Sequence, residues 1–344
     1  MYANVKTRID EAQRIIIIQP ENPDADSLGS SIALDEILAP LGKEVTMFCA
    51  IDMPKYLHYI EGWSRAEKNF TGKYDLAIIV DTAAEALIVK TLATPGMRHF
   101  LETRPVIVLD HHNESKNDED NEANDLSFPH DFILDETAAA TSELVLSIAT
   151  ENSWAINKPA ADAMLASVLG DTLGLSTPSV SQRTIESVLE LMKLGAHPAE
   201  IEKKRREYMK KPADILEYKG KLIERIEYFC DGRLALVHIP WEDIQQYSDR
   251  YNPSILVLDE MRLVEGVDVA IAIKTYPDSK LTGKIRSNLP IAGQIAGFFG
   301  GGGHEYSAGY KIYENYDTAC QELLTATEKI LQEYDNEHAS TETL

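Results

Sequence analysis

Residues 15–41, IIIIQPENPDADSLGSSIALDEILAPL, decide the fold. They open with four consecutive isoleucines at 15–18, a short apolar run typical of a buried strand. From Ser31 to Leu41 the apolar residues recur at helical spacing, and a proline and a glycine end the helix. Between strand and helix lies a polar turn that carries Asp24 and Asp26. A strand, an acidic turn and a helix in this order predict the first βα unit of a parallel sheet.

The same alternation continues along the chain to about residue 110. Apolar runs at Val45–Cys49, Leu76–Val80 and Val106–Leu109 are expected to form further buried strands. Helical patterns follow at Thr137–Thr150 and Lys158–Leu169. The fold class is therefore predicted as α/β, with an N-terminal parallel sheet that has helices on both faces.

After residue 195 the pattern changes. A long charged helical stretch comes first, followed by strand-like runs at Arg233–Ile239 and Val267–Tyr276. A small helix at Ile291–Phe299 and a last helix ending near Tyr334 complete a second α/β domain. The predicted boundaries are a catalytic domain over 1–195, a helical connector over 196–220, a smaller α/β domain over 221–335 and a disordered tail over 336–344.

Composition limits the partners. The 344 residues include 33 basic and 56 acidic ones, a net charge of -23 that repels long nucleic acid. Small phosphorylated ligands stay open, because metal ions and a few cations can neutralise a site on an acidic body. The three cysteines, Cys49, Cys230 and Cys320, form no C-x-x-C pair and favour a reducing compartment. Without a signal-peptide pattern or an apolar run of membrane-spanning length, we expect a cytoplasmic protein with no membrane association.

Acidic and histidine residues follow the predicted strands at their carboxyl ends. Asp24 and Asp26 follow the first strand, Asp81 follows the third, and Asp110-His111-His112 follows the fourth. This edge is where open parallel sheets bind ligands. Carboxylates that converge there repel each other and require cations, and oxygen ligands mixed with imidazole suit Mn²⁺ or Mg²⁺. Two ions bridged by one carboxylate would activate a water for attack on phosphorus.

Each motif also has a purely structural interpretation. The Asp24-Ala25-Asp26 step could be a turn whose side chains bond to its own backbone, and Asp81 could cap a helix. His111 and His112 could be a solvated pair. Their occurrence together at successive strand ends favours the metal site.

A glycine run marks the second domain. Gly300–Gly303 and His304 precede the strand-like segment AGYKIY. Glycines permit close backbone approach and let amides face a phosphate, although a flexible loop is the alternative. Arg286 and Ser287 lie shortly before the run, and a guanidinium is a natural bidentate partner for a terminal phosphate. These features predict a phosphate-binding second domain.

Together these segments resemble the DHH/DHHA1 phosphoesterase superfamily, and within it the compact nanoRNase and pAp-phosphatase group, over nearly the whole chain. NPDADSLGS resembles the first motif, Asp81 the second, Asp110-His111-His112 the third, and Asp171 in GDTLGLST the fourth. KIRSN and GGGGHEYSAGY resemble the DHHA1 substrate-binding signature. The resemblance implies a metal-dependent hydrolase of short nucleotides: nanoRNA, pApA-type dinucleotides or pAp. The oligomeric state stays open, with a homodimer favoured by the prevalence of twofold symmetry and by the habit of the family.

The resemblance also implies individual roles. Asp81 would bridge two Mn²⁺ ions, with Mg²⁺ as the alternative, and would act with His112 at the scissile phosphate. One ion would be held by Asp26, Asp81, His111 and Asp171, and the other by Asp24 and Asp81. The substrate-binding set would be Arg286, Ser287, Gly302, Gly303 and His304.

One position departs from the family pattern. A histidine usually lies three residues before the proline of the first motif, and Pro20 occupies that place here. One of the two metal ions therefore loses a ligand. This ion would be bound weakly, would be coordinated in part by substrate oxygens, or would recruit Gln19 or Glu21. We expect activity to be retained. The rival hypothesis is a nucleotide-binding or regulatory protein that is not an enzyme, and a family II pyrophosphatase or a RecJ-like exonuclease fits less well.

Overall fold

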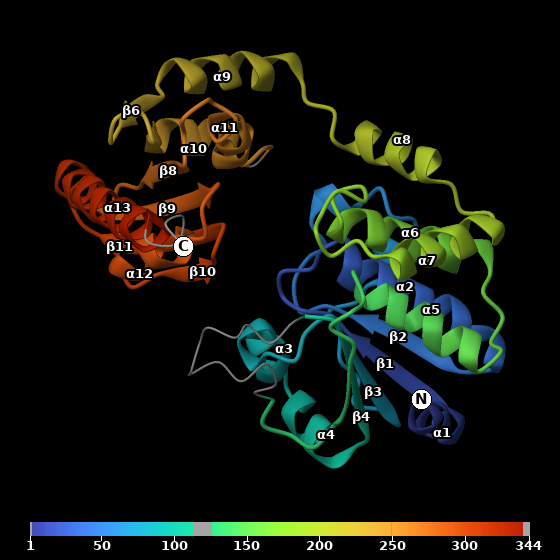
Figure 1. The fold of residues 1–344 in the computed structure, drawn as a ribbon. Coiled ribbons are helices and arrows are strands. Elements are labelled where there is room, and N and C mark those ends of the chain that lie inside the picture. The colour runs from blue at the N-terminus through green and yellow to red at the C-terminus, as the bar shows by residue number, and fades with distance from the viewer. Residues whose placement is uncertain (1, 113–125, 249, 340–344) are drawn as a thin grey trace. The chain divides into compact units, whose positions relative to one another are not determined.

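The structure is a computed structural model that describes residues 2–112, 126–248 and 250–339. The chain divides into two compact units, residues 1–210 (unit 1) and residues 211–344 (unit 2) (Figure 1). The division falls between helices α8 (Pro198–Tyr208) and α9 (Ala213–Glu224), inside the stretch predicted as a connector. Within the described residues, no helix is long and apolar enough to cross a membrane.

Unit 1 is built on a five-stranded sheet with the order β2-β1-β3-β4-β5, in which all neighbours are parallel. The parallel sheet expected from the alternating pattern is confirmed. The edge strand β5 escapes sequence-based prediction because its residues are only half-buried and its apolar run is only three residues long. The strands are β1 (Arg14–Ile18), β2 (Glu44–Phe48), β3 (Leu76–Val80), β4 (Val106–Asp110) and β5 (Asp131–Leu134).

Helices cover both faces of this sheet (Figure 1). The four isoleucines of β1 explain the arrangement, because Ile15 and Ile17 enter one core while Ile16 and Ile18 enter the other. Helices α1, α2, α5 and α6 supply the first core, and α3 and α4 supply the second. The helices of unit 1 are α1 (Ala3–Glu11), α2 (Ala25–Leu38), α3 (Val89–Ala93), α4 (Met97–Thr103), α5 (Thr141–Glu151), α6 (Lys158–Asp171), α7 (Gln182–Lys193) and α8, with short 3₁₀ turns at Ala39–Leu41, Lys55–Leu57, Trp63–Arg65 and Glu85–Leu87.

Unit 2 contains a six-stranded mixed sheet in the order β10-β11-β9-β8-β7-β6, in which only β7 and β8 are parallel neighbours. Helices α9, α10 and α11 pack on one face, and α12 and α13 pack on the other. The strands are β6 (Glu227–Phe229), β7 (Leu234–Ile239), β8 (Val269–Thr275), β9 (Lys280–Ser287), β10 (Gly302–His304) and β11 (Ser307–Tyr313), and the remaining helices are α10 (Trp241–Tyr247), α11 (Pro253–Met261), α12 (Ala292–Phe298) and α13 (Tyr316–Ala339).

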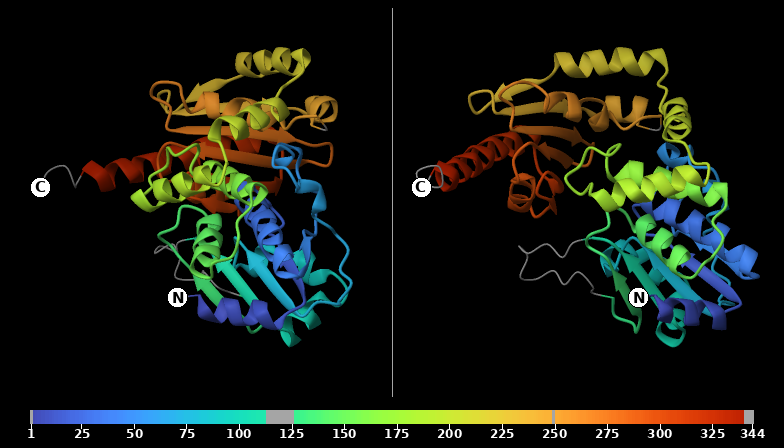
Figure 2. Two further views of the ribbon diagram at one scale, coloured as in Figure 1. Left: turned by 90° about the vertical axis from the view of Figure 1, so that its right-hand side faces the viewer. Right: turned by 45° about the vertical axis from the view of Figure 1, so that its right-hand side comes forward.

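The final helix corrects one expectation. α13, drawn in red in Figures 1 and 2, continues to Ala339, so residues 336–339 are helical rather than part of a disordered tail. Residues 340–344 of the predicted tail lie outside the described residues. The apolar residues Leu323 and Leu331 hold this helix against the sheet.

Candidate active site

The two aspartates of the first motif have different surroundings. Asp24 is the N-cap of α2, and its Oδ1 accepts hydrogen bonds from the backbone N–H of Asp26 at 2.9 Å and of Ser27 at 3.0 Å. Capping starts the helix at Ala25, earlier than the apolar spacing predicts. The structural interpretation of the Asp-Ala-Asp turn therefore holds for Asp24, whose Oδ2 accepts no hydrogen bond from the described residues.

Asp26 is fully buried, and the backbone N–H groups that bond to it come from a distant helix rather than from its own turn. Its Oδ2 accepts the backbone N–H of Thr141 at 2.6 Å, and its Oδ1 accepts that of Ser142 at 3.1 Å. Both amides belong to the first turn of α5, whose N-cap, Ala140, has no side chain able to accept them. The positive end of the helix dipole therefore stabilises the Asp26 carboxylate and fixes its orientation.

Ser167 of α6 adds a third contact, because its hydroxyl donates to Asp26 Oδ1 at 2.5 Å. Sequence reasoning misses Thr141, Ser142 and Ser167 because each is more than one hundred residues from Asp26. The helix was predicted to begin at Thr137, whereas α5 begins at Thr141, so the Thr141-Ser142 pair was not recognised as a helix start and its partner Asp26 could not be inferred.

His111 lies among three carboxylates. Its Nε2 is 3.2 Å from Asp171 Oδ2, 3.5 Å from Asp26 Oδ2 and 3.7 Å from Asp81 Oδ1, yet it is buried without a well-directed hydrogen bond. The other ring nitrogen, Nδ1, lies 3.2 Å from the backbone oxygen of Ala138, which can only accept. With a metal ion bound and the ring proton on Nδ1, His111 would direct the Nε2 lone pair toward that ion.

Asp81 lies at the end of β3 and is nearly buried. Its backbone has a φ of 64°, a left-handed conformation that is uncommon for residues with a side chain and is found at functional turns. Its Oδ1 accepts a hydrogen bond from the Thr141 hydroxyl at 3.2 Å. Thr141 thus contacts both Asp26, through its amide, and Asp81, through its hydroxyl.

Burial and mutual repulsion shift the protonation of this cluster. Burial raises the pKa of Asp81 well above its usual range, and the charges of Asp26 and Asp24 add to the effect. Burial also raises the pKa of Asp171 to about 6, although His111 opposes the shift. For His111, burial acts to lower the pKa, but contacts with Asp171 and Asp26 outweigh it and raise the pKa to about 9. The cluster is short of positive charge.

Asp110 orients the two histidines. Its Oδ1 accepts the backbone N–H of His111 at 2.8 Å and of His112 at 3.1 Å, and lies 2.7 Å from Nδ1 of the His112 ring. The contact with Asp110 raises the pKa of His112 against the effect of burial. The His112 side chain is 59% exposed and its Nδ1 lies 3.8 Å from Asp81 Oδ1, so it can contact a ligand that reaches the cluster.

The ligand set fits a divalent cation. Ligand atoms of Asp26, His111 and Asp171 lie within 4.8 Å of one another, as do those of Asp81, His111 and His112. Carboxylate oxygens with one imidazole whose tautomer is fixed by a backbone carbonyl are typical donors for Mn²⁺ or Mg²⁺. Asp26, Asp81, His111 and Asp171, the set that the family resemblance implies, are therefore candidates to hold one ion.

The position of the missing histidine offers little to a second ion. Pro20 has no ligand atom in its side chain. Glu21 is engaged elsewhere, because its Oε1 accepts the backbone N–H groups of Lys90 and of Thr91, the latter at 3.0 Å, at the start of α3. Gln19 is fully buried, and neither atom of its amide has a hydrogen-bond partner among the described residues. Of the two predicted substitutes, only Gln19 has an uncommitted side chain.

Unit 2 carries the other predicted site residues. Arg286 of β9 is half-buried, and its Nη1 donates to the backbone oxygen of Ile285 at 3.1 Å and to the Ser307 hydroxyl. Ser287 is fully buried on the opposite face, where its hydroxyl donates to the Asp268 backbone oxygen at 3.1 Å. The grouping of Ser287 with Arg286 as a substrate-binding residue is thus corrected, because successive residues of a strand point to opposite faces.

The second half of the glycine run is strand rather than open loop. Gly302–His304 forms β10 and pairs with β11, in which Gly303 lies opposite Ala308. A Cβ at Gly303 would lie 2.6 Å from the Cα of Ala308, and the φ of Gly303 is 144°. Gly302 is exposed and would meet nothing within 4 Å. Close pairing of β10 with β11 therefore explains why position 303 is a glycine. No such contact constrains Gly302, whose backbone is accessible to a ligand.

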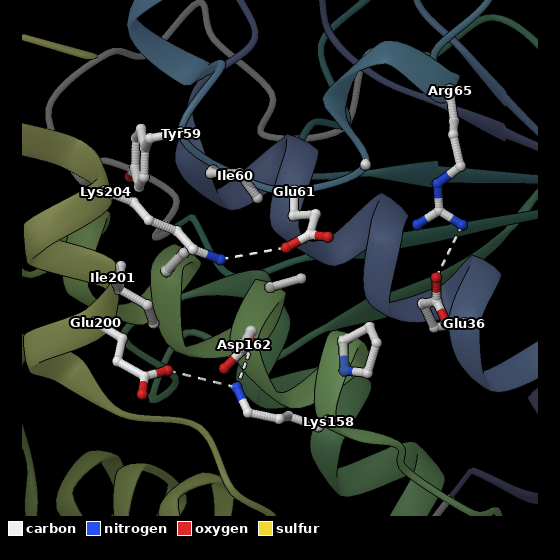
Figure 3. Close-up of a pocket in the computed structure, with 14 residues that line it drawn as sticks. Glu36, Tyr59, Ile60, Glu61, Arg65, Lys158, Asp162, Glu200, Ile201 and Lys204 are labelled. Carbon is white, nitrogen blue, oxygen red and sulfur yellow. Dashed lines mark hydrogen bonds and ion pairs between the residues drawn. The ribbon is translucent and has the colours of Figure 1, made fainter. Parts of the chain in front are cut away.

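A separate cavity of about 450 Å³ lies in unit 1 and shares no residue with the acidic cluster (Figure 3). Its charged residues pair with each other: Lys204 Nζ lies 3.2 Å from Glu61, and Lys158 Nζ lies 2.7 Å from Asp162. Its cations are thus already neutralised by carboxylates. The acidic cluster, in which the charges are unbalanced, is the better candidate for chemistry.

Comparison with known proteins defines the class. Residues 14–168 match the sequence model described as "DHH family, N-terminal domain". This segment contains β1 to β5 and the cluster residues Asp26, Asp81 and His111. Residues 14–168 are thus similar to the N-terminal domain of the DHH family, and the matches indicate a phosphoester hydrolase.

Two curated relatives span nearly the whole chain. The chain is 23% identical over 320 residues to the "Probable bifunctional oligoribonuclease and PAP phosphatase NrnA" of Streptococcus mutans, covering 92% of this chain and 96% of that protein. It is 21% identical over 324 residues to the "Bifunctional oligoribonuclease and PAP phosphatase NrnA" of Bacillus subtilis, covering 93% and 96%. Among solved structures, an exopolyphosphatase-related protein from Bacteroides fragilis has a TM-score of 0.78 at 19% identity and covers 97% of this chain and 96% of its own. That likeness confirms the two-part fold.

Proposed function

We propose that this protein is a metal-dependent phosphodiesterase and phosphatase of short nucleotides, acting on nanoRNA, pApA-type dinucleotides or pAp. The observation that carries the proposal is His111 Nε2, which is buried among three carboxylates within 3.7 Å and has no hydrogen bond of its own. The names of the relatives in Streptococcus mutans and Bacillus subtilis support the substrate class. Mn²⁺, a cytoplasmic location and a homodimer belong to the same proposal.

The chain's own residues have distinct tasks in this proposal. Asp26, Asp81, His111 and Asp171 hold the better-formed metal site, and Asp24 with Asp81 contributes to the weaker one. Bound divalent ions polarise the phosphoryl oxygen and supply an ionised water. His112, oriented by Asp110, lies at the edge of the cluster and can stabilise or protonate a substrate oxygen. Asp26 stays correctly placed because α5 and Ser167 fix both of its oxygens.

The rival proposal is a nucleotide-binding protein without turnover. Pro20, together with the engaged carboxylate of Glu21, is the observation behind it. The four-residue set around His111 favours an enzyme instead, because a complete site for one divalent ion suffices to polarise a phosphoryl group.

A hydrolysis screen of the purified protein tests the proposal directly. Mn²⁺, Mg²⁺ or chelator would be combined with pApA, short RNA oligomers and pAp, and mononucleotide and phosphate release would be measured. We expect turnover with Mn²⁺ and a loss of at least about a thousandfold in Asp81→Asn, which keeps the side-chain volume but removes the carboxylate charge that would hold the metal.

Asp162→Asn is the matched control. Asp162 lies on α6, the helix that ends at Asp171, but its Oδ2 pairs with Lys158 and it is not part of the cluster. This variant should keep full activity. Nucleotide binding without release of any product in the parent protein would overturn the proposal and favour the rival.

A further inference from the structure

One segment of unit 1, residues 135–143, orients two of the proposed metal ligands. It leads from the end of β5 into the first turn of α5. The backbone oxygen of Ala138 lies 3.2 Å from His111 Nδ1, and the amides of Thr141 and of the residue after it donate to the Asp26 carboxylate. A shift of this segment would therefore change the orientation of an imidazole and a carboxylate at the same time.

Arg183 of α7 holds the beginning of this segment. Its Nη1 donates to Asp135 Oδ2 at 2.5 Å and to the Thr137 hydroxyl at 3.1 Å. The other oxygen of Asp135 accepts the backbone N–H of Thr137 at 3.1 Å and its hydroxyl at 2.6 Å. The guanidinium and the carboxylate together fix the turn that leads to Ala138.

The same guanidinium reaches α5, which lies beside α7 (Figure 1). Its Nη2 donates to the Ser147 hydroxyl at 3.4 Å, and its Nε lies 3.7 Å from Glu143 Oε2. Glu143 is the third residue of α5, and its side chain is fully buried. Neither of its carboxylate oxygens accepts a well-directed hydrogen bond from the described residues. A buried carboxylate in this position needs a nearby cation, and Arg183 supplies one.

Arg183 is thus shared by two carboxylates at opposite ends of one segment. Burial acts to raise the pKa of Asp135, but the contacts with Thr137 and Arg183 outweigh it and lower the pKa. Burial raises the pKa of Glu143, and the charge of Arg183 opposes this shift. Without the guanidinium, both carboxylates would lose their counter-charge and the two ends of the segment would lose the contact that joins them.

We propose that Arg183 is a positioning residue of the metal site. By joining the two ends of segment 135–143, it fixes the backbone groups that orient His111 and Asp26, and it thereby raises the affinity of the site for a divalent ion. This inference rests on the proposed function, because it takes His111 and Asp26 as metal ligands. Arg183 itself pairs with carboxylates outside the ligand set.

Titration of the full chain with Mn²⁺, followed by electron paramagnetic resonance of the free ion, tests this inference without turnover. We expect Arg183→Met to weaken Mn²⁺ binding by about tenfold, as when the support behind a metal ligand is lost. Arg183→Lys returns a positive charge to the site and should recover part of the affinity. A merely structural role of the side chain would not be rescued by charge.

Asp135→Asn removes the partner charge while keeping the side-chain volume, and it should weaken Mn²⁺ binding in the same direction. Since Asp135 and Arg183 act through one contact, the double variant with Arg183→Met should bind Mn²⁺ about as Arg183→Met alone does. Losses that add in the double variant would mean that the two residues act independently, against the inference. If Arg183→Met does not fold, Asp135→Asn decides the point, and an unchanged affinity there would overturn the inference.

Arg8→Met is the matched control. Arg8 of α1 pairs at 2.9 Å with Asp131, at the other end of β5, and its side chain is 38% exposed, against 35% for Arg183. This variant should bind Mn²⁺ as the parent does. Equal losses in Arg183→Met and Arg8→Met would overturn the inference, as would an unchanged affinity in Arg183→Met. A parent that binds Mn²⁺ but hydrolyses none of the nucleotides would refute the proposed function and leave the role of Arg183 standing.

Discussion

At the scale of single residues, Pro20 is the position that bears on the binding of a second metal ion. It stands where the family pattern has a histidine, and the neighbouring Glu21 is committed to the start of α3. We expect Pro20→His to strengthen the binding of a second Mn²⁺ ion by about tenfold or more, because it adds an imidazole ligand. Titration followed by electron paramagnetic resonance of free Mn²⁺ measures this without reference to activity.

Pro20→Ala is the matched control, because it removes the ring without adding a ligand. If Pro20→Ala and Pro20→His bind Mn²⁺ equally, the position does not face the ion. A fall in hydrolysis in Pro20→His, despite tighter metal binding, would show that the site has adapted to the proline.

His111 makes the stability of the metal-free protein depend on pH. Its pKa is raised to about 9, above the ordinary value of 6.5. The stabilisation from its charged form is therefore complete below about pH 6.5 and is lost as the pH rises through about 9. The pKa of Asp171, raised to about 6, changes stability in the same direction at lower pH.

We therefore expect the melting temperature of unit 1 in chelator to fall between about pH 6.5 and pH 9, and bound Mn²⁺ to reduce the fall. Thermal melts at several pH values measure this. His111→Gln should flatten the profile, and His99→Gln, on the exposed surface of α4, should not. An unchanged slope in His111→Gln would contradict the assignment.

At the scale of elements, the β10–β11 pair depends on one glycine. A Cβ at Gly303 would lie 2.6 Å from two backbone atoms of β11, Ala308 Cα and Ser307 O. We expect Gly303→Ala to destabilise unit 2 by about 1–3 kcal/mol. Gly302→Ala is the control, because a Cβ there meets nothing within 4 Å. Urea unfolding of both variants decides the point, and equal losses would rule out the steric explanation.

At the scale of the whole molecule, the division into residues 1–210 and 211–344 predicts two unfolding transitions. We expect Mn²⁺ to shift only the transition of unit 1. Metal at a hundredfold excess over its dissociation constant adds about 2.7 kcal/mol to the unit that binds it. Trp63 and Trp154 belong to unit 1, and Trp241 belongs to unit 2.

Tryptophan fluorescence can therefore follow each unit separately. In Trp241→Phe, the unfolding transition reported by the two remaining tryptophans should shift to higher temperature with Mn²⁺. In the Trp63→Phe, Trp154→Phe double variant, the transition reported by Trp241 should not shift. Identical shifts in both proteins would mean that the two units unfold together.

The amino-acid sequence was enough to predict four of the five strands of the unit 1 sheet and the acidic and histidine residues at their carboxyl ends. Four apolar strands could be recognised, and in β1, β3 and β4 both faces are buried, so nearly every residue of these three is apolar. Asp26, Asp81 and His111 could be placed together because parallel strands end at one edge. The half-buried strand β5 and the helical residues 336–339 could not be recognised, because neither has a strong apolar pattern.

Only the tertiary structure decided what surrounds those residues. The helix start at Thr141 that binds Asp26, the commitment of Glu21 to α3, and the burial of Ser287 all depend on contacts between distant segments. The same is true of Arg183 and Asp135, which become neighbours only through the packing of α7 beside α5. Local sequence patterns fix which face a side chain occupies, but the partners across that face are set by packing, which the local pattern does not contain.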